Sequence, residues 1–295
     1  MSNLTQRILT AVVLAVAFVL TLWVDTPWPF WLLTLLFIGA AAWEWSRLIG
    51  WTGWRAWASS MVCAVCAVAV SVVCSIGVMR WAPVVFGVAC LLWIVGGPWL
   101  LWHGVARWPA LPRWLRWCVG MAVLAVAWTA LAIVGTWNVN FLLSALALVW
   151  AADIGGYVFG RALGGKLTGG RKLAPSISPG KTWEGALGGF VGVLLVSEIW
   201  VWFDLNWLDR IWRSAGVSIY SMLWLHGSFW YVVGLAFLTT MSVVGDLTES
   251  LVKRAAGVKD SSGLLPGHGG VLDRIDALLS VLPLAMFIAV QYWGR

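Results

Sequence analysis

The chain has 295 residues, of which 61% are apolar and only 11% are charged, and its mean hydropathy is +0.89. A water-soluble domain of this size carries about a quarter charged residues, so the composition excludes a soluble globular enzyme and a disordered chain. It predicts a membrane protein with several spanning segments. The net charge of +7 comes from basic residues scattered along the chain, which argues against nucleic acid as a partner.

Apolar runs long enough to cross a bilayer follow one another along the whole chain. About 20 helical residues cross the hydrocarbon core, and the runs are continuous rather than alternating, which favours helices over β-barrel strands. We therefore predict an all-α, polytopic integral membrane protein with about nine transmembrane helices. The predicted spans are residues 8–24, 29–45, 57–79, 82–102, 118–137, 140–160, 183–203, 229–247 and 274–293.

The basic residues predict how these spans are oriented. Lys and Arg are enriched in cytoplasmic loops. If the N-terminus is cytoplasmic, nine spans leave all but four of the 19 basic residues on the cytoplasmic side. The four exceptions are Arg80, Arg210, Arg213 and Arg295. We expect a protein of the cell (inner) membrane, with its C-terminus on the other side and its active site facing the cytoplasm.

The acidic residues divide the chain into two parts. Only Asp25 and Glu44 precede Asp153, and the remaining acids follow it. We therefore expect residues 1–139 to be a transmembrane scaffold of about five helices. Residues 140–295 are expected to be the catalytic membrane region, with about four helices and cytoplasmic motif loops. Glu44, at the end of the second span, is interpreted as a snorkelling or structural acid.

The first of three polar stretches on the predicted cytoplasmic side surrounds Asp153. Ionisable groups at membrane depth are costly and usually functional. The neighbouring Gly155, Gly156 and Gly160 allow another helix backbone to approach closely. Asp153 is therefore either a functional acid or the buried, paired acid of a helix-packing motif.

The second stretch contains Ser178, Lys181 and Thr182 just before the seventh span. Its Gly-Lys-Thr sequence resembles the end of a Walker A loop, but Pro175 stands where the first Gly is required and no strand is expected before it. A P-loop is therefore excluded. A Lys beside the N-terminus of a helix favours a phosphate group, and an ordinary capped helix start is the alternative.

The third stretch is the richest in charge. If the helix of the eighth span continues beyond the membrane, one face carries Asp246, Glu249, Ser250 and Lys253. A Gly-rich loop then folds back. Asp273 and Asp276 share a face at the start of the ninth span. Converging carboxylates suit Mg²⁺, and adjacent Lys and Arg side chains suit polyphosphate.

His268 lies in the loop of this third stretch. No second His or Cys stands at zinc-binding spacing from it. Three interpretations therefore remain open: His268 contacts a phosphate, transfers a proton, or caps the turn that follows.

The third stretch resembles the long C-terminal motif of phosphatidate cytidylyltransferases, also called CDP-diacylglycerol synthases. The residues that carry the resemblance are Ser250, Lys253, Arg254, Lys259, Asp260, Leu265 to Gly270, Asp273, Arg274 and Asp276. The Ser-Pro-Gly-Lys-Thr-Trp-Glu-Gly stretch from Ser178 also resembles an upstream motif of that family. So do Asp153, Tyr157, Gly160 and Arg161, and the resemblance covers roughly residues 150–276.

The resemblance implies that phosphatidate and CTP are converted into CDP-diacylglycerol and pyrophosphate. It also implies dependence on Mg²⁺, with two cation sites of which one can take K⁺, and with Asp246 and Asp273 as metal-binding carboxylates. Together with Lys181 and Lys253, these two form the predicted catalytic set. The predicted substrate-binding residues are Ser178, Lys181, Thr182, Ser250, Lys253, Arg254, His268 and Arg274, with Asp153, Glu249 and Asp276 in supporting positions.

The expected partners are CTP, phosphatidate and the lipid bilayer, and a homodimer is expected. The sequence leaves three other functions open. A CTP-dependent kinase of a lipid alcohol would transfer the γ-phosphoryl group. A secondary transporter would show repeats and binding groups near the midplane, and a lipid scaffold would have no use for clustered ionisable groups.

Overall fold

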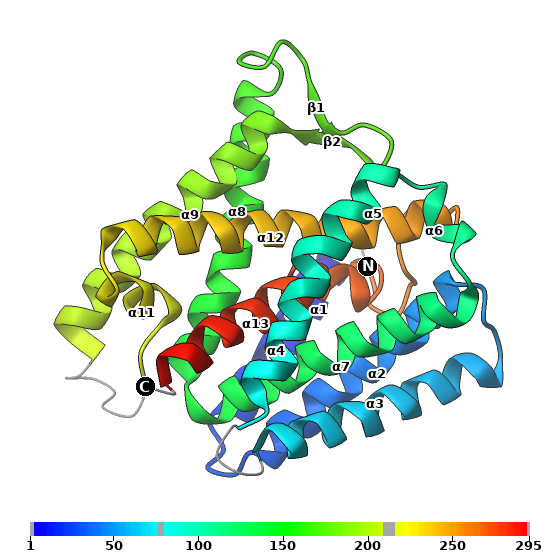
Figure 1. The fold of residues 1–295 in the computed structure, drawn as a ribbon, viewed down its shortest axis with the longest axis horizontal. Coiled ribbons are helices and arrows are strands. Elements are labelled where there is room, and N and C mark those ends of the chain that lie inside the picture. Colours follow the sequence, from blue (N-terminus) through cyan, green and yellow to red (C-terminus); the bar gives the residue numbers. More distant parts are fainter. Residues whose placement is uncertain (1–2, 76–79, 209–215, 294–295) are drawn as a thin grey trace.

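The structure is a computed structural model that describes residues 3–75, 80–208 and 216–293. Arg210, Arg213 and Arg295, and the end of the third predicted span, lie outside the described residues. The predicted all-α membrane architecture is confirmed, and Figure 1 shows the arrangement of the helices.

The helical elements follow the predicted spans closely, and their bounds are as follows. They are α1 (Asn3–Leu22), α2 (Trp28–Leu48), α3 (Trp54–Ser75), α4 (Ala82–Leu91), the π-helical η1 (Leu92–Gly96), α5 (Gly97–His103), α6 (Arg107–Ala110), α7 (Arg113–Trp137), α8 (Val139–Leu163), α9 (Trp183–Phe203), the π-helical η2 (Asp204–Leu208), α11 (Ile219–Leu225), α12 (Ser228–Ala255) and α13 (Leu272–Trp293).

Among the described residues, eight helices are long and apolar enough to cross a membrane. The one predicted span that is not among the eight is the second, residues 29–45, which corresponds to the 21-residue helix α2. Its polar and charged residues, Glu44 and Arg47 among them, lower its hydropathy. The orientation of the spans stays a prediction.

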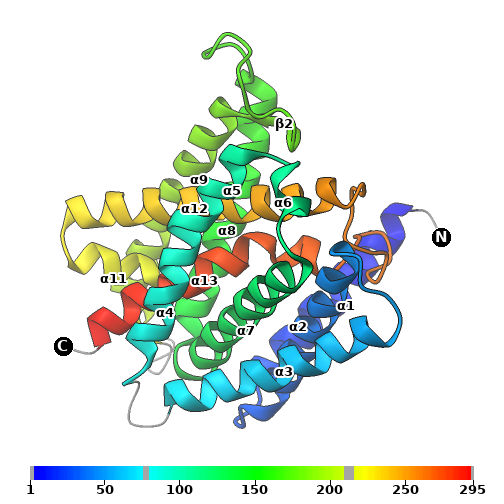
Figure 2. The same ribbon diagram turned by 45° about the vertical axis from the view of Figure 1, so that its right-hand side comes forward.

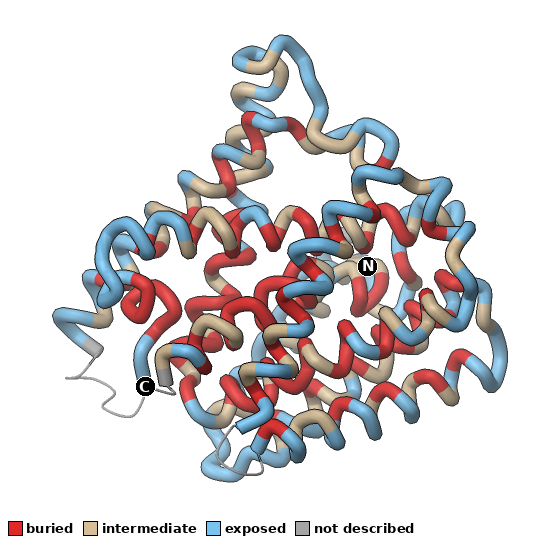
Figure 3. The backbone as a smooth tube through the Cα atoms, in the orientation of Figure 1, coloured by how far each residue is buried: buried red, intermediate tan, exposed pale blue. Residues whose placement is uncertain are grey.

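The centre of the molecule is formed by α7, α8 and α13. Within their apolar stretches, 72% of α7 and 61% of α13 is buried, against none of α1. Figure 3 shows the buried residues gathered along these central helices, with the exposed residues around the edge. The exposed apolar side chains of the outer helices are those expected to face lipid.

The helices α8 and α9 pack as a close pair that rises beyond the rest of the bundle (Figures 1 and 2). Glycines make this approach possible. A Cβ atom on Gly155 would lie 2.5 Å from the carbonyl oxygen of Gly188, and one on Gly192 would lie 2.8 Å from that of Ala151. The small residues predicted to allow close helix packing therefore do so.

A short antiparallel hairpin connects this pair, formed by β1 (Lys172–Ala174) and β2 (Ser178–Thr182). The expectation that no strand precedes the seventh span was wrong. Lys172 pairs with Thr182 and Ala174 pairs with Ser178. This pairing gives hydrogen-bond partners to backbone N–H and C=O groups that would lack them in an irregular loop. The Gly-Lys-Thr sequence lies within β2 itself rather than in a loop after a strand, so the P-loop stays excluded.

We expect Gly155→Ala to lower the free energy of unfolding by about 2 kcal/mol, because its methyl group would meet backbone that cannot move aside. The matched control is Gly39→Ala on α2, where the nearest atom to a new Cβ is 3.9 Å away. Thermal unfolding in detergent measures both. Equal stability of the two variants would contradict the close packing of α8 on α9.

Candidate active site

A cavity of about 580 Å³ lies where α8, α9 and β2 meet α12 and α13. It brings together charged residues from all three polar stretches of the sequence. The charged and hydroxyl-bearing residues of its lining are Asp153, Tyr157, Ser178, Lys181, Thr182, Asp246, Asp273 and Asp276. Four carboxylates and a lysine therefore face a common space.

Lys181 on β2 forms an ion pair with Asp246 on α12. The two side chains are 28% and 24% exposed, so both can still be reached from the cavity. Ser250 is one turn further along α12 and donates a hydrogen bond from its Oγ to Asp246 Oδ1 at 3.3 Å. The hairpin that the sequence did not predict is thus what carries Lys181 to the acid.

Lys253 lies between two carboxylates in a more closed environment. Its Nζ is 2.7 Å from Glu249 Oε2 and 2.6 Å from Asp273 Oδ1. The side chains of Lys253, Glu249 and Asp273 are 11%, 2% and 4% exposed, respectively. Buried charges are tolerated only when they are paired in this way, so the three residues stabilise one another as a unit. Because α12 continues as a helix beyond the predicted span, as far as Ala255, Glu249 and Lys253 lie one turn apart.

Asp273 also holds the loop between α12 and α13. Its carboxylate accepts hydrogen bonds from the Ser261 N–H at 3.0 Å, the Ser261 Oγ at 3.0 Å and the Gly270 N–H at 2.8 Å. It lies in the first turn of α13, where the positive end of the helix dipole stabilises a negative charge. The carboxylate is therefore fixed in place by its own loop.

Glu44 on α2 is a structural acid, which is one of the two interpretations of the sequence, but the sequence did not reveal what it holds. It has no exposed surface, and it accepts hydrogen bonds from Ser261 Oγ at 3.2 Å, Ser262 Oγ at 2.5 Å, Val271 N–H at 3.0 Å and Leu272 N–H at 2.7 Å. A lone acid at the end of an apolar helix was the available signal. Its partners lie more than 210 residues along the chain, so spacing could not identify them.

Gly270 shows how closely this loop fits around the two acids. A Cβ atom there would lie 1.9 Å from Ser261 Oγ and 2.5 Å from Glu44 Oε1. Only glycine can occupy the position without displacing a hydrogen-bonded group.

Asp153 and Asp276 also line the cavity, and in the part of the chain that the structure describes neither has an ion-pair partner. Asp276 Oδ1 accepts a hydrogen bond from the Ala277 N–H at 2.8 Å. Both interpretations of Asp153, as a functional and as a structural acid, stay predictions.

Several predicted substrate-binding residues lie away from the cavity lining. Arg254 donates from Nε to the Ile177 carbonyl at 3.2 Å, which anchors the turn of the hairpin. Arg274 donates from Nη2 to the His268 carbonyl at 2.9 Å. Their substrate contacts, and that of His268, stay predictions.

Thr182 lines the cavity and also caps a helix. It is the N-cap of α9, and its Oγ1 accepts a hydrogen bond from the Gly185 N–H at 3.1 Å. The predicted helix start after Lys181 is therefore confirmed, including the capped form that was the alternative to phosphate binding. Phosphate binding at this helix start stays a prediction.

The donor set of the cavity fits a hard divalent cation. All four acidic groups are carboxylates, which are the ligands that Mg²⁺ prefers. Among the described residues, no three of His, Cys, Asp and Glu stand ready at coordinating geometry. Lys181 and Lys253 instead supply the positive charge beside Asp246 and Asp273.

Comparison with known sequences assigns nearly the whole chain to one protein family. The sequence profile of the cytidylyltransferase family matches residues 5–292. The chain belongs to the cytidylyltransferase family. This confirms the resemblance drawn from the polar motifs, and it extends that resemblance from the C-terminal half to the N-terminal helices.

Curated relatives agree with the family match. The phosphatidate cytidylyltransferase of Pseudomonas aeruginosa is 36% identical over 268 residues, which cover 88% of this chain and 89% of that protein. The phosphatidate cytidylyltransferase of Haemophilus influenzae is 46% identical over 142 residues, or 48% of this chain and 43% of that protein. That of Synechocystis sp. is 42% identical over 146 residues, or 50% and 42%.

We expect Glu44→Ala to lower the free energy of unfolding by about 3 kcal/mol, because two backbone N–H groups and the Ser262 hydroxyl lose a buried carboxylate acceptor. Glu198→Ala is the control, since Glu198 is exposed on α9. Thermal unfolding of both variants is the measurement. A Glu44→Ala protein as stable as the control would show that Glu44 does not hold the loop.

Proposed function

We propose that the chain is a phosphatidate cytidylyltransferase, which makes CDP-diacylglycerol from phosphatidate and CTP. The observation that carries this proposal is the convergence of four carboxylates and Lys181 on one cavity in a member of the cytidylyltransferase family. The name shared by its curated relatives supports the choice of substrates.

In the proposed reaction, a phosphate oxygen of phosphatidate attacks the α-phosphorus of CTP in line. A new P–O bond forms there, the bond from the α-phosphorus to the oxygen bridging to the β-phosphorus breaks, and pyrophosphate leaves. A phosphate monoester is already ionised at neutral pH, so no general base is required. The protein's contribution is mainly to position the groups and neutralise their charge.

Asp246 and Asp273 are the residues that we propose to hold Mg²⁺, in two sites of which one can take K⁺. Asp153 and Asp276 line the same cavity and would support them, as Glu249 would through Lys253. When bound, such cations would stabilise the negative charge on the attacking and leaving oxygens.

The lysines would then exchange one partner for another. Lys181 neutralises Asp246 in this structure, and Lys253 neutralises Asp273. When a cation binds either carboxylate, the lysine ammonium group is no longer needed to neutralise that carboxylate. We propose that Lys181, which is the more exposed of the two, turns to the phosphates of CTP or phosphatidate.

An apolar groove adjoins the charged cavity and suits the acyl chains of the substrate. It has a volume of about 600 Å³ and lies between α9, α12, α5 and the hairpin. It shares Leu173, Ala186 and Val243 with the charged cavity. The phosphate of phosphatidate would thus meet Lys181 while its chains remain among apolar side chains.

The direction in which this site faces follows from the basic residues of the loops. We propose that it opens to the cytoplasm at the inner face of the cell membrane, with the N-terminus on the same side. The division into a scaffold before residue 140 and a catalytic region after it, and the homodimer, are parts of the same proposal.

The proposal is tested with purified protein, phosphatidate, Mg²⁺ and CTP labelled separately at the α- and γ-phosphates. We expect the α-label to appear in lipid. Asp273→Asn should reduce the rate on the order of 10³-fold. The reason is that the cation, which stabilises the charge of the transition state by several kcal/mol, loses a ligand. Asp25→Asn, an exposed acid between α1 and α2, should have no effect.

Transfer of the γ-label to lipid would contradict this proposal and indicate a lipid kinase. Absence of label from lipid, with protein whose unfolding transition is intact, would contradict both enzymes.

We expect Lys181→Met to slow cytidylyl transfer and, without nucleotide, to tighten the binding of Mn²⁺ as a probe for Mg²⁺. The reason is that Asp246 loses the ammonium group that competes with the cation. Electron paramagnetic resonance of free Mn²⁺ measures the affinity. The control is Lys172→Met, an exposed lysine on the other strand of the hairpin. Weaker Mn²⁺ binding by Lys181→Met would contradict the proposed exchange.

A further inference from the structure

Arginines without acidic partners gather at one end of the helical bundle. Residues 45–152 contain six arginines and neither lysine nor any acidic residue. Five of the six lie where α2 ends or where α3, α6 and α7 begin: Arg47, Arg55, Arg107, Arg113 and Arg116. The ion pairs that the structure shows among the described residues all involve Lys181 or Lys253. Within that part of the chain, these arginines are therefore not neutralised by a carboxylate.

Contacts between helices bring four exposed arginines onto one surface. The starts of α3 and α7 are held side by side, because Trp117 Nε1 donates a hydrogen bond to Ser59 Oγ at 2.9 Å. In the turn between α2 and α3, a Cβ atom on Gly50 would lie 4.0 Å from the Cζ and Nη2 atoms of Arg113. Figure 1 shows α6 and these helix ends together at its right-hand side. The arginine surface is defined by four exposed residues: Arg47, Arg55, Arg107 and Arg113.

The helix ends at the arginine surface add to its positive charge. A helix N-terminus carries about half a positive charge, and neither α3 nor α7, which both begin here, has an acid in its first turn. The negative end of α2, with Arg47 in its last turn, offsets part of this charge. Glu44, one turn earlier on α2, is buried and accepts hydrogen bonds from the loop before α13. The surface therefore remains positive, and it lies on the same side of the bundle as that loop.

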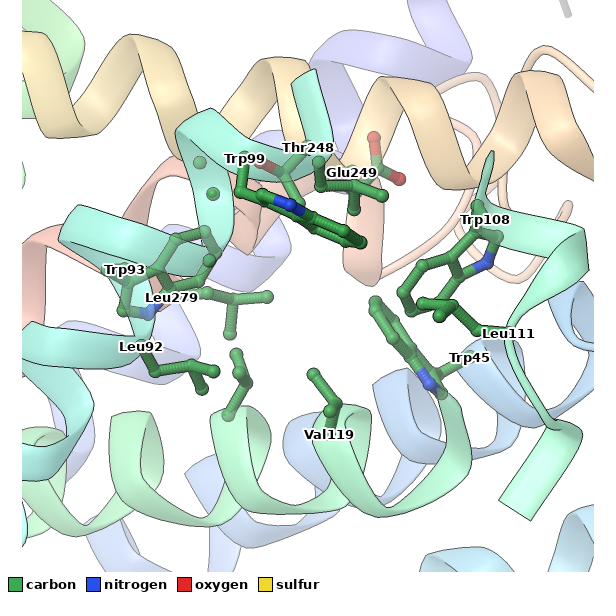
Figure 4. A pocket seen from close by; sticks show the side chains of 15 residues that line it. Trp45, Leu92, Trp93, Trp99, Trp108, Leu111, Val119, Thr248, Glu249 and Leu279 are labelled. Carbon is green, nitrogen blue, oxygen red and sulfur yellow. The ribbon is translucent and has the colours of Figure 1, made fainter. Parts of the chain in front are cut away.

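Tryptophan rings hold three of these guanidinium groups in place. A cation stacks favourably on a tryptophan within about 6 Å of the ring centroid. The distances from Cζ to the ring centroid are 4.6 Å for Arg47 on Trp43, 5.9 Å for Arg55 on Trp54 and 5.7 Å for Arg107 on Trp99. Figure 4 shows the ring of Trp99 among the side chains that line a cavity of about 150 Å³. Each ring covers one face of its guanidinium group and leaves the edge accessible.

The edges of these guanidinium groups carry unused hydrogen-bond donors. In the described part of the chain, none of the four arginines donates a hydrogen bond from its side chain, whereas the buried Arg116 donates from Nε to the Leu111 carbonyl at 3.2 Å. Arginine binds phosphate through paired N–H groups in the plane of the guanidinium. The arginine surface therefore offers the donors and the charge that suit a phosphate group.

Exposed tryptophans around the arginine surface indicate the depth at which it lies. Trp54, Trp57 and Trp114 are 75%, 64% and 64% exposed. Tryptophan is enriched at the membrane–water interface, at the level of the lipid headgroups. The phosphates that surround the protein at that depth are those of phospholipids. A lipid headgroup is therefore the partner that fits this surface.

We propose that the arginine surface binds the headgroups of anionic phospholipids, at a site separate from the charged cavity. The lipid phosphate lies between guanidinium groups at the turn from α2 to α3, and its acyl chains remain in the bilayer. An anionic headgroup neutralises the surface, whereas a zwitterionic headgroup brings a cation of its own. The proposal does not depend on which reaction the charged cavity performs.

The test is titration of the full-length, delipidated protein in neutral detergent with phosphatidylglycerol, measured by native mass spectrometry. Phosphatidylcholine with the same acyl chains is the comparison without net charge. We expect phosphatidylglycerol to bind on the order of tenfold more tightly, because several arginines contribute to its attraction.

Single substitutions assign the binding to the arginine surface. Arg55→Gln should weaken the binding of phosphatidylglycerol by about fivefold, the effect of one arginine beside an anionic headgroup. Arg80→Gln is the matched control and should have no effect. Arg80 is also exposed and lies over Trp81 at 6.0 Å, but it is found between α3 and α4, at the opposite end of α3.

Replacing Arg47, Arg55 and Arg113 together by glutamine should remove the preference for phosphatidylglycerol over phosphatidylcholine. Thermal unfolding of each variant shows that it is folded. Lys181→Met should leave the binding of phosphatidylglycerol unchanged, because Lys181 belongs to the charged cavity.

Several outcomes would overturn the proposal. Equal binding of the two lipids by the wild-type protein, or equal effects of Arg55→Gln and Arg80→Gln, would mean that the arginine surface does not recognise anionic headgroups. Loss of binding in Lys181→Met would place the lipid in the charged cavity. Displacement of the lipid by inorganic phosphate, beyond that caused by sodium chloride of the same ionic strength, would indicate a site for free anions.

Discussion

A carboxylate without any exposed surface, Glu44, holds the loop that precedes α13, and the position of the charged cavity depends on it. The backbone N–H groups that this loop buries need acceptors within the protein. Glu44 accepts from Val271 and Leu272, while Asp273 accepts from Ser261 and Gly270. The acid from α2 and the acid from α13 therefore fold the same loop from two sides. Through it, the N-terminal helices, which look like scaffold in the sequence, take part in building the site.

The four carboxylates of the cavity differ in how far they are buried and in whether an ion pair holds them. Asp273 is enclosed and bonded on several sides, Asp246 is paired but accessible, and Asp153 and Asp276 have no ion-pair partner among the described residues. A buried ion pair contributes little to stability by itself. In the proposed reaction, the lysines would keep the acids neutralised until cations and substrate phosphates bind.

Sequence reasoning succeeded where the pattern is local. The spans, the helix start after Thr182, and the continuation of α12 follow from hydropathy and i, i+3, i+4 spacing. It failed where the partner is remote or the backbone is unusual. The hairpin at Lys172–Thr182 depends on the projecting α8 and α9, and the partners of the structural acid Glu44 lie in a loop more than 210 residues away. Nor does any periodicity reveal the π-helical turn at η1, because one extra residue per turn leaves no sequence signature of its own.

Hydrogen exchange of the wild-type loop between α12 and α13 is the most direct test of the role of Glu44 and Asp273. We expect the amides of Ser261, Gly270, Val271 and Leu272 to be protected, because each donates to a buried carboxylate. The exposed Gly263 in the same loop should exchange rapidly. Uniformly rapid exchange across the loop would contradict the claim that Glu44 and Asp273 hold it in place.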